Sequence, residues 1–249
     1  MMKYEDFWYL SKIGFLDQVE PPASSDVLKC IKHSTYNRHD IIRTPDAPQH
    51  ELCFIKEGSV RLYTINEQGK QFTYSLLGPG STFGKIKYFS LSCDDVYVEA
   101  IEPTHFCAID EKAFLTLSEK YPILLHKALE ALSERLHERE QRLKYMALEN
   151  SREKIIHILQ TLYDRYNSPS ENQNYYTIAF PITQQELANM VGVSRESVSI
   201  VFTELANEGL IRFPKRKQID VHYSLVNNDP NPPYIQALYT NSSYPKPFN

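Results

Sequence analysis

The sequence has little of what marks a secreted, membrane or zinc-binding protein. Only four of its 249 residues are cysteines and none stands in a Cys-x-x-Cys pair, so neither a disulfide scaffold nor a zinc ribbon is indicated. It has no stretch of about eighteen apolar residues, which a membrane-spanning helix would need. Its first residues, "MMKYEDFWYLSKIGFLDQVE", carry charges within the apolar stretch and show no small-residue cleavage pattern. We therefore expect a cytoplasmic protein that does not associate with a membrane.

Common catalytic motifs are missing as well. The sequence contains no His-Glu-x-x-His, no Gly-x-Ser-x-Gly and no phosphate-binding loop, so we expect neither an enzyme nor a bound cofactor. A net charge of −4 gives the whole chain no general affinity for nucleic acid. Any DNA-binding surface must therefore be local, and the one basic cluster lies at residues 215–217.

The first half of the chain is rich in short strand patterns. Between about Tyr36 and Asp110, segments rich in Val, Ile, Tyr and Phe alternate in polarity and are separated by turn signals such as "NEQGK" and "GPGS". The expected strands are "DIIRT", "HELCFIKEG", "SVRLYTIN", "QFTYSLLG", "VYVEAIE" and "HFCAID". Many short strands at this spacing predict an antiparallel barrel or sandwich.

A helical pattern replaces the strand pattern after Asp110. The segment "EKAFLTLSEKYP" predicts a short helix, and Pro122 suits the first turn of a longer one that runs to about residue 148. Apolar residues recur along it at steps of three, four and seven: Leu125, Leu129, Leu132, Leu136, Leu143 and Met146. This narrow stripe is typical of a seam between two helices, so residues 122–148 are expected to join two copies of the chain. The alternative is that the stripe packs only on its own strand domain.

A hinge and a third helix are expected next. Asn150 and Ser151 resemble a cap and hinge, with Ser151 capping a helix through Leu162. The polar segment "NSPSENQN" then predicts a loop and "YTIAFPI" a strand. Residues 227–249 are dense in Pro and Asn, which predicts a poorly ordered or surface-draped tail.

The segment "ITQQELANMVGVSRESVSIVFTELANEGLI" predicts a helix-turn-helix. Thr183 followed by Glu186 forms a capping-box pattern, Gly192 supplies a turn, Ser194 caps the second helix and Gly209 ends it in the left-handed conformation. The buried positions are expected to be Leu187, Met190, Val191, Val198, Val201, Phe202 and Leu205. The following "LIRFPKRKQIDVHYSLV" predicts a wing of two strands.

The second helix carries polar residues on the face opposite its apolar one. Arg195, Glu196, Ser199 and Thr203 share this face, and arginine can pair with guanine while glutamate accepts from cytosine. We expect base contacts from Arg195, Glu196 and Ser199. Backbone contacts are expected from a further set: Ser194, Ser197, Thr203, Lys215, Arg216 and Lys217. The alternative is an ordinary solvated helix and an exposed charged hairpin.

The order of strand domain, long helix, hinge and winged helix resembles the family of cyclic-AMP receptor protein and fumarate-nitrate regulators. "EGSVRLYTINEQGKQFTYSLLGPGSTFGK" is similar to the β-roll of that family, and "ITQQELANMVGVSRESVS" to its helix-turn-helix. The resemblance implies an α+β fold: residues 1–118 as a β-roll (double-stranded β-helix) effector domain with an N-terminal helical segment, 119–150 as dimerisation helix and hinge, and 151–226 as the winged helix. It also implies a bacterial homodimeric activator with two partners, inverted-repeat DNA and RNA polymerase.

Three departures from the family pattern bear on control and readout. Cyclic-nucleotide binders of the family carry Gly-Glu and a later Arg-Ser or Arg-Thr pair, where this chain has Gly84-Lys85 and then Asp94 and Asp95, whose charges repel a phosphodiester. The cysteine cluster of the iron-sulfur members is absent, and the four histidines that could ligate haem are expected at the surface or on strands: His33, His39, His50 and His105. Ile200 stands where the family usually places an arginine, so one base pair of the site should be read less strictly.

Within the family, the "GK" of Gly84-Lys85 and "YVEAIEPTHFCAID" resemble the halophenol-sensing regulators. That resemblance implies that Lys85 and Arg135 surround a small organic anion between β-roll and long helix. The expected pocket residues are Tyr74, Gly84, Lys85, Tyr88, Arg135 and Arg139. Alternatively the two cations pair with Glu134, Glu138 or Asp94, and the regulator is constitutive. Cys107 matches a cysteine whose oxidation blocks activity in that group, which makes it a candidate redox site.

Overall fold

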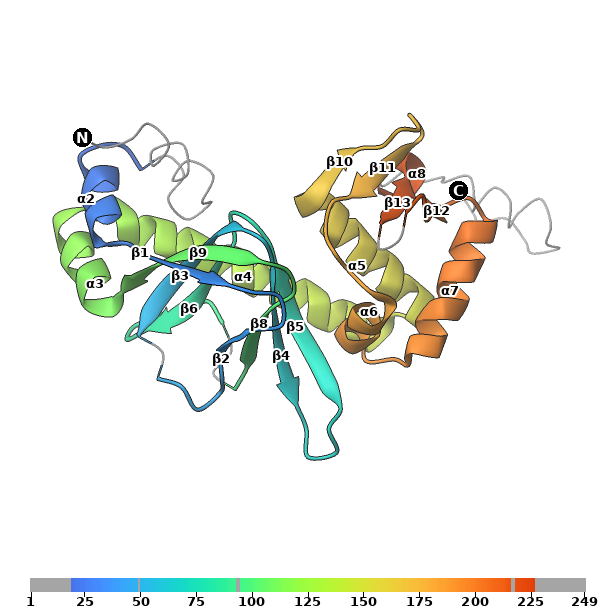
Figure 1. Cartoon of the computed structure of the whole chain (residues 1–249), viewed down its shortest axis with the longest axis horizontal. Coiled ribbons are helices and arrows are strands. Elements are labelled where there is room, and N and C mark those ends of the chain that lie inside the picture. The colour runs from blue at the N-terminus through green and yellow to red at the C-terminus, as the bar shows by residue number, and fades with distance from the viewer. Residues whose placement is uncertain (1–18, 49, 93–94, 216–217, 227–249) are drawn as a thin grey trace, which may run out of the picture. The chain divides into compact units, whose positions relative to one another are not determined.

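The computed structural model describes residues 19–48, 50–92, 95–215 and 218–226 (Figure 1). The chain divides into two compact units, Met1–Lys144 and Tyr145–Asn249, called here the N-terminal and C-terminal units. The predicted tail at 227–249 lies outside the described residues.

The strands of the N-terminal unit form two antiparallel sheets. One has the order β1-β9-β3-β6-β7 and the other β2-β8-β4-β5. The bounds are β1 Lys32–Tyr36, β2 Ile41–Arg43, β3 Glu51–Glu57, β4 Val60–Ile65, β5 Gln71–Leu77, β6 Thr82–Ile86, β7 Phe89–Ser90, β8 Tyr97–Ala100 and β9 Thr104–Asp110. All six predicted strands are confirmed. The prediction missed β1, β6 and β7.

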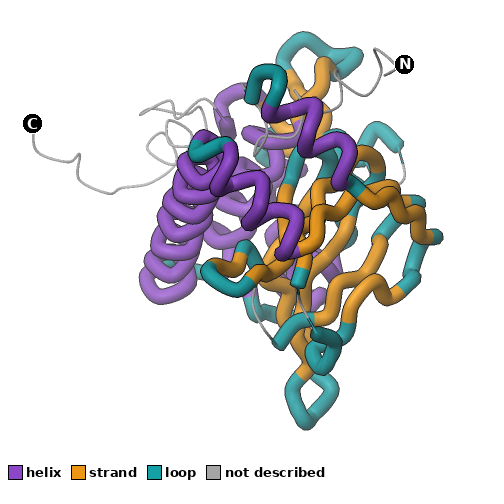
Figure 2. The backbone as a smooth tube through the Cα atoms, turned by 90° about the vertical axis from the view of Figure 1, so that its left-hand side faces the viewer, coloured by secondary structure: helices purple, strands orange, loops and turns teal. Residues whose placement is uncertain are grey.

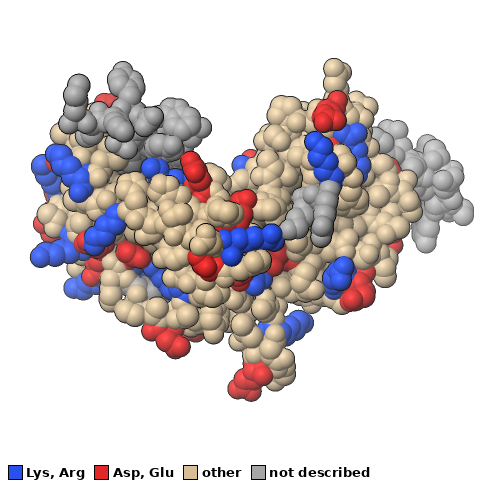
Figure 3. Space-filling view, viewed as in Figure 1, with Lys and Arg blue, Asp and Glu red and all other residues tan. Residues whose placement is uncertain are grey.

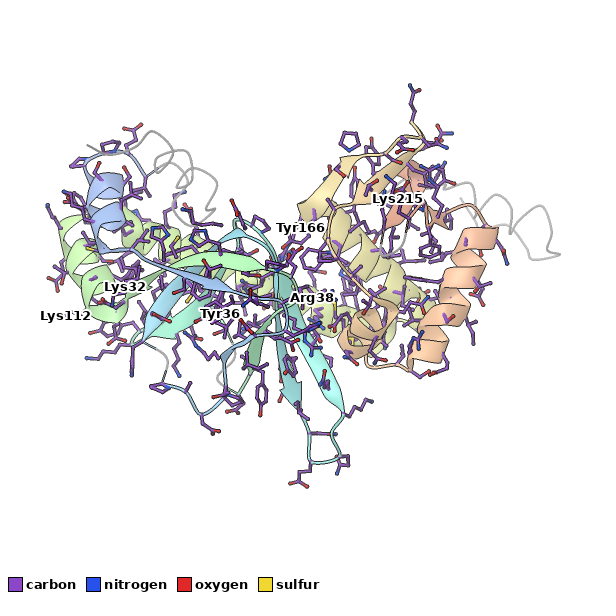
Figure 4. The ribbon with its side chains drawn as sticks, in the orientation of Figure 1. Lys32, Tyr36, Arg38, Lys112, Tyr166 and Lys215 are labelled. Atoms are coloured by element: carbon purple, nitrogen blue, oxygen red, sulfur yellow. The ribbon has the colours of Figure 1, made fainter. Side chains whose placement is uncertain are left out.

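The core between the two sheets explains their alternating sequence. Cys53, Phe83 and Phe106 from the first sheet are buried against Leu62 and Val98 from the second. On β1, Tyr36 stacks on Phe106 with 5.4 Å between the ring centroids (Figure 4). The β4–β5 hairpin extends beyond the other strands to its turn (Figures 1 and 2).

Gly84 occupies a position in β6 that only glycine fits. Its φ is +115°, and a Cβ there would lie 2.3 Å from the carbonyl oxygen of Glu51 on β3. The close approach of β3 and β6 therefore depends on this residue.

A second core lies where helices cover the outer face of the first sheet. Leu52, Phe54 and Ile86 pack there with Leu124 and Ala128 of the long helix. The helices are α2 Ala23–Cys30, α3 Glu111–Lys120 and α4 Ile123–Leu148. Both predicted helices after Asp110 are confirmed, with the carbonyl oxygen of Pro122 accepting from the first turn of α4.

The C-terminal unit is the predicted winged helix with one extra hairpin strand. Its elements are α5 Ser151–Tyr166, β10 Asn167–Pro169, β11 Tyr175–Ile178, α6 Gln184–Val191, α7 Arg195–Asn207, β12 Ile211–Arg212, β13 Ile219–His222 and α8 Tyr223–Val226. The strands form one antiparallel sheet of order β10-β11-β13-β12, and the wing is β12 and β13.

The predicted cap of α5 is wrong by one residue. Asn150, not Ser151, accepts hydrogen bonds from the backbone nitrogens of Arg152 and Glu153, while the Glu153 carboxylate accepts from the Asn150 nitrogen. This reciprocal capping box uses an acid three residues after the cap, which Ser151 does not have. The helix also runs to Tyr166 rather than ending at Leu162, which is buried within it.

Candidate nucleic-acid interface

The two helices of the helix-turn-helix are fixed by local capping, as the sequence predicts. The Thr183 hydroxyl accepts from the Glu186 nitrogen at 3.2 Å, and the Ser194 hydroxyl accepts from the Ser197 nitrogen at 3.1 Å. Gly192 and Gly209 both have positive φ, 74° and 73°. All seven predicted core positions of the two helices are buried. The exposed face of α7 is therefore set by the opposite side of the same helix.

The α7 face carries the predicted base-reading side chains in an open position. Arg195, Glu196, Ser199 and Thr203 are exposed, and Ser197 is half-buried. Neither Arg195 nor Glu196 makes a hydrogen bond or ion pair within the part of the chain that the structure describes. An arginine and a glutamate left without partners at the start of a recognition helix can bond to base edges without first breaking a bond in the protein.

A hollow of about 610 Å³ adjoins this face. Gln184 and Gln185 at the start of α6, Arg195 at the start of α7 and Gln218 in the wing contribute polar groups to it, and Phe213 contributes an apolar wall. Sequence reasoning missed the three glutamines. The available signal was the pair Gln184-Gln185 directly after the Thr183 cap, where amide groups lie beside the free backbone nitrogens of the helix.

A buried charge cluster holds the wing. Asp220 on β13 is fully buried and accepts two hydrogen bonds from Arg212 on β12, from Nε at 2.9 Å and Nη2 at 2.7 Å. The hydroxyls of Ser170 and Thr177 each donate to the same carboxylate at 2.7 Å. Burial alone would raise the pKa of Asp220, but the hydrogen bonds from Thr177, Ser170 and Arg212 outweigh it and lower that pKa. The wing is thus anchored to the β10–β11 hairpin, a function that the sequence analysis did not assign to any of these residues.

The wing tip carries the predicted basic cluster only in part. Lys215 lies in the loop between β12 and β13, and its ammonium group is 3.9 Å from the Glu171 carboxylate (Figure 4). Arg216 and Lys217 lie outside the described residues. On the face that Figure 3 shows, acidic and basic side chains are interspersed rather than gathered into one basic field. An interaction with nucleic acid must therefore depend on local contacts.

Arg152 links the start of α5 to the recognition helix. Its guanidinium donates to Glu208 at 2.6 Å and to Glu204 at 3.3 Å, and its side chain is 26% exposed. Both glutamates lie in or directly after the last turns of α7. This contact was not predicted, and it ties α7 to the helix that follows the hinge.

Among the predicted effector residues, Arg135 reaches the β-roll. Its Nη2 donates to the Thr82 carbonyl at 3.1 Å, which places this part of α4 beside the first residue of β6. Its Nη1 lies 3.7 Å from the Glu138 carboxylate, which is one of the alternative pairings considered for this arginine.

Lys85 lies on a different face of β6 from the helix contacts. It pairs opposite Glu51, and alternation places it with Phe83 and Cys53 on the side of the core between the sheets. Gly84 and Ile86 take the other side, where α4 packs through its first turns.

Three further predicted pocket residues lie at the surface. Tyr74 is 36% exposed and Tyr88 72% exposed, and Arg139 is exposed on α4. The carbonyl of Tyr74 accepts a hydrogen bond from Arg142, a residue not predicted to contribute, which also donates to the Thr73 carbonyl at 2.8 Å.

Cys107 is buried in β9, and its thiol lies 3.7 Å from the Phe54 carbonyl. Burial raises the pKa of this thiol to about 11, which leaves little thiolate at neutral pH. We expect iodoacetamide to label Cys30, which is half-buried, well before Cys107 in the native protein. Peptide mass spectrometry over time measures this order. Equal labelling rates, with folding verified by circular dichroism, would show instead that Cys107 is accessible for redox chemistry.

Two searches of the described residues bear on other site classes. No helix among them is long and apolar enough to cross a membrane. Nor do the described residues include a group of three or more His, Cys, Asp or Glu side chains suited to a metal ion.

Comparison with known families matches both halves of the chain. Residues 33–121 match the cyclic nucleotide-binding domain family, and residues 153–223 match the Crp-like helix-turn-helix domain family. The cyclic AMP receptor protein of Thermus thermophilus is 30% identical over 161 residues, which cover 65% of this chain and 70% of that protein.

Solved structures show the same fold. FixK2 from Bradyrhizobium japonicum superposes with a TM-score of 0.69 at 18% identity, covering 87% of this chain and 99% of that one. The structure described as "OCPA complexed CprK" superposes with a TM-score of 0.59 at 20% identity, covering 78% of this chain and 86% of that one. These likenesses confirm the predicted β-roll and winged helix but do not place the chain in the halophenol-sensing branch. The matched families and relatives are regulators rather than enzymes, and the chain belongs to the Crp/Fnr family of DNA-binding transcription regulators.

Proposed function

We propose that this regulator acts as a cytoplasmic homodimer that reads an inverted repeat containing G·C pairs and recruits RNA polymerase. The observation that carries the proposal is the pair Arg195 and Glu196, exposed and without partners in the described structure at the first turn of α7. Arginine can bond bidentately to O6 and N7 of guanine, while glutamate accepts from N4 of cytosine. The wing supplies Lys215 and the adjacent basic residues for phosphates.

Selection of bound duplexes from a random DNA pool tests this proposal directly. The purified, reduced full-length protein should enrich an inverted repeat whose half-sites contain a G·C pair and lie about 34 Å apart, one turn of DNA. If no sequence is enriched with or without a candidate effector, the reading of α7 as a base-specific helix is wrong.

Replacing Arg195 with alanine should remove discrimination at one base pair. We expect about 1–3 kcal/mol of lost specificity at that pair, because the bidentate contact to guanine is gone while the phosphate contacts remain. Fluorescence anisotropy on duplexes with each base pair substituted in turn measures the effect.

The matched control is Asn207→Ala, which changes an exposed residue at the far end of the same helix. It should leave the discrimination profile of the wild type unchanged. An Arg195→Ala protein with an unaltered profile would contradict the assignment.

For control, we propose a small organic anion, with a halogenated phenolate as the first candidate, bound between the β-roll and α4. Lys85 and Arg135 would supply the positive charge, and the anion would offset the cost of partly buried cations. Relatives named for cyclic AMP make that nucleotide the main competitor. Lys85 after Gly84, where cyclic-nucleotide binders of the family carry an acid, argues against it.

The proposed consequence of binding is a shift in how two copies of α4 pack. That shift would move the two α7 helices toward the spacing of successive major grooves. The anion can bias this equilibrium only if it contacts the two states differently.

Thermal unfolding with a ligand panel separates the possibilities. At about a hundredfold excess over Kd, a bound anion should raise the Tm by roughly 5–10 °C. We expect 2-chlorophenolate to do so, cyclic AMP not to, and Arg135→Ala to lose the response, while Lys87→Ala, an exposed neighbour of Lys85, keeps it. A shift with cyclic AMP alone would overturn the choice of ligand. No shift with any ligand, together with DNA binding, would indicate a constitutive regulator.

A further inference from the structure

Ile200 lies at the centre of the α7 face that is turned away from the core. It is four residues after Glu196 and three before Thr203, so the three side chains are neighbours on the helix surface. The buried residues of α7 occupy the opposite side. Ile200 is 61% exposed, although most large apolar residues of this unit are buried. The position most central to the proposed DNA-facing surface is therefore apolar.

Polar groups close to Ile200 are engaged within the helix. The Thr203 hydroxyl donates to the Ser199 carbonyl at 2.9 Å, and the hydroxyls of Ser194 and Ser197 lie 2.9 Å apart and bond to each other. Thr203 therefore has no free proton to offer a base in this arrangement. The side chains beside Ile200 cannot supply the donor pattern that guanine requires without breaking these bonds.

We propose that Ile200 determines specificity by packing against the C5 methyl group of a thymine in the major groove. Thymine is the only base that presents a methyl group there, and apolar side chains recognise it by contact. Ile200 stands five residues after Arg195, about 7.5 Å along the helix axis. At about 3.4 Å per base pair, the thymine lies within roughly two base pairs of the G·C pair read by Arg195.

This inference rests on the proposed function, because it requires α7 to enter the major groove. It adds a requirement that the base-reading arginine and glutamate do not impose. The half-site must contain a T·A pair whose recognition depends on a single methyl group rather than on hydrogen bonds.

Deoxyuridine substitution tests the requirement, since uracil pairs like thymine but lacks the methyl group. On the duplex selected by the wild-type protein, each thymine of a half-site is replaced in turn and affinity is measured by anisotropy. At one position we expect the wild type to bind about fourfold more weakly, and about fifteenfold when both half-sites are changed, from the loss of one buried methyl per half-site. Ile200→Ala should bind the thymine and uracil duplexes equally at that position and keep its discrimination at the G·C pair.

Two further variants guard the interpretation. Ile200→Val keeps an apolar β-branched group and should retain part of the thymine preference. Ile65→Ala removes an isoleucine that is 40% exposed on the β-roll and should behave as the wild type. If the wild type binds the selected site but no uracil position weakens it, or if Ile200→Ala keeps the same thymine preference, this inference is wrong and the proposed function stands. If no duplex is selected at all, the proposed function itself fails.

Discussion

Replacing Asp220 with alanine should lower the free energy of unfolding of the C-terminal unit by about 3 kcal/mol, because removal of one partner of a buried ion pair leaves the other uncompensated. Asp220 is 0% exposed, and Arg212, Ser170 and Thr177 all donate to it. The value is at the low end for such changes, since the Arg212 side chain is 32% exposed and can recover some hydration. Urea titration followed by circular dichroism measures it.

The control for this change is Asp164→Ala. Asp164 is exposed on α5, so its loss should alter the free energy of unfolding by less than about 0.5 kcal/mol. A loss below about 1 kcal/mol for Asp220→Ala would show that the cluster contributes no more than a surface contact.

The lowered pKa of Asp220 also fixes the direction of its pH dependence. A carboxylate whose folded-state pKa is depressed stabilises the protein above its unfolded pKa, near 4, and this contribution is lost as the pH falls through the folded-state value. Stability should therefore decline on acidification below about pH 4, and Asp220→Asn should flatten that part of the curve.

The helix-turn-helix could be predicted because its determinants are local. Thr183, Ser194, Gly192 and Gly209 each act within a few residues, and periodicity alone identified the buried face of α7. The Asp220 cluster could not be predicted in the same way, because its partners come from two other strands and a loop. One signal was present: an acid between Ile219 and Val221 in a strand has to be buried with them or exposed alone.

The β-roll shows the complementary limit. The pattern of Val, Ile, Tyr and Phe located six strands, but β6 begins after Gly80 and contains Gly84, and such glycines read as turns. The effector residues depend on which way a strand faces. Resemblance placed Lys85 and Arg135 together, whereas register with β3 puts Lys85 on the side of Cys53 and Phe83. Register is a tertiary property that a motif does not encode.

The predicted stripe on α4 is present and largely uncovered in a single copy of the chain. Leu125 is 44% exposed, Leu129 63%, Leu136 59% and Leu143 72%. Leu124 and Ala128, on another side of the same helix, are the residues that pack on the β-roll. The alternative that the whole stripe packs on its own strand domain is therefore wrong for these four leucines. Apolar residues at alternating steps of three and four are typical of a two-helix seam.

Replacing Leu136 with aspartate should dissociate the proposed dimer. Each dimer would lose two buried leucines, worth about 1.5–3 kcal/mol apiece, so its dissociation constant should rise about a hundredfold or more. DNA affinity should fall with it, because a monomer reads only one half-site. Light scattering coupled to size-exclusion chromatography measures the mass across a concentration series.

The neighbouring change His137→Asp introduces the same residue at an exposed position outside the stripe, so it should leave the mass of a dimer. Arg139 provides the opposite test, since it occupies the seam position three residues after Leu136 and four before Leu143. In a parallel dimer the two copies of Arg139 would face each other, and like charges in a seam are destabilising. Arg139→Leu should therefore strengthen the dimer. A Leu136→Asp protein that keeps the mass of a dimer, with Arg139→Leu having no effect, would place the interface elsewhere than on α4.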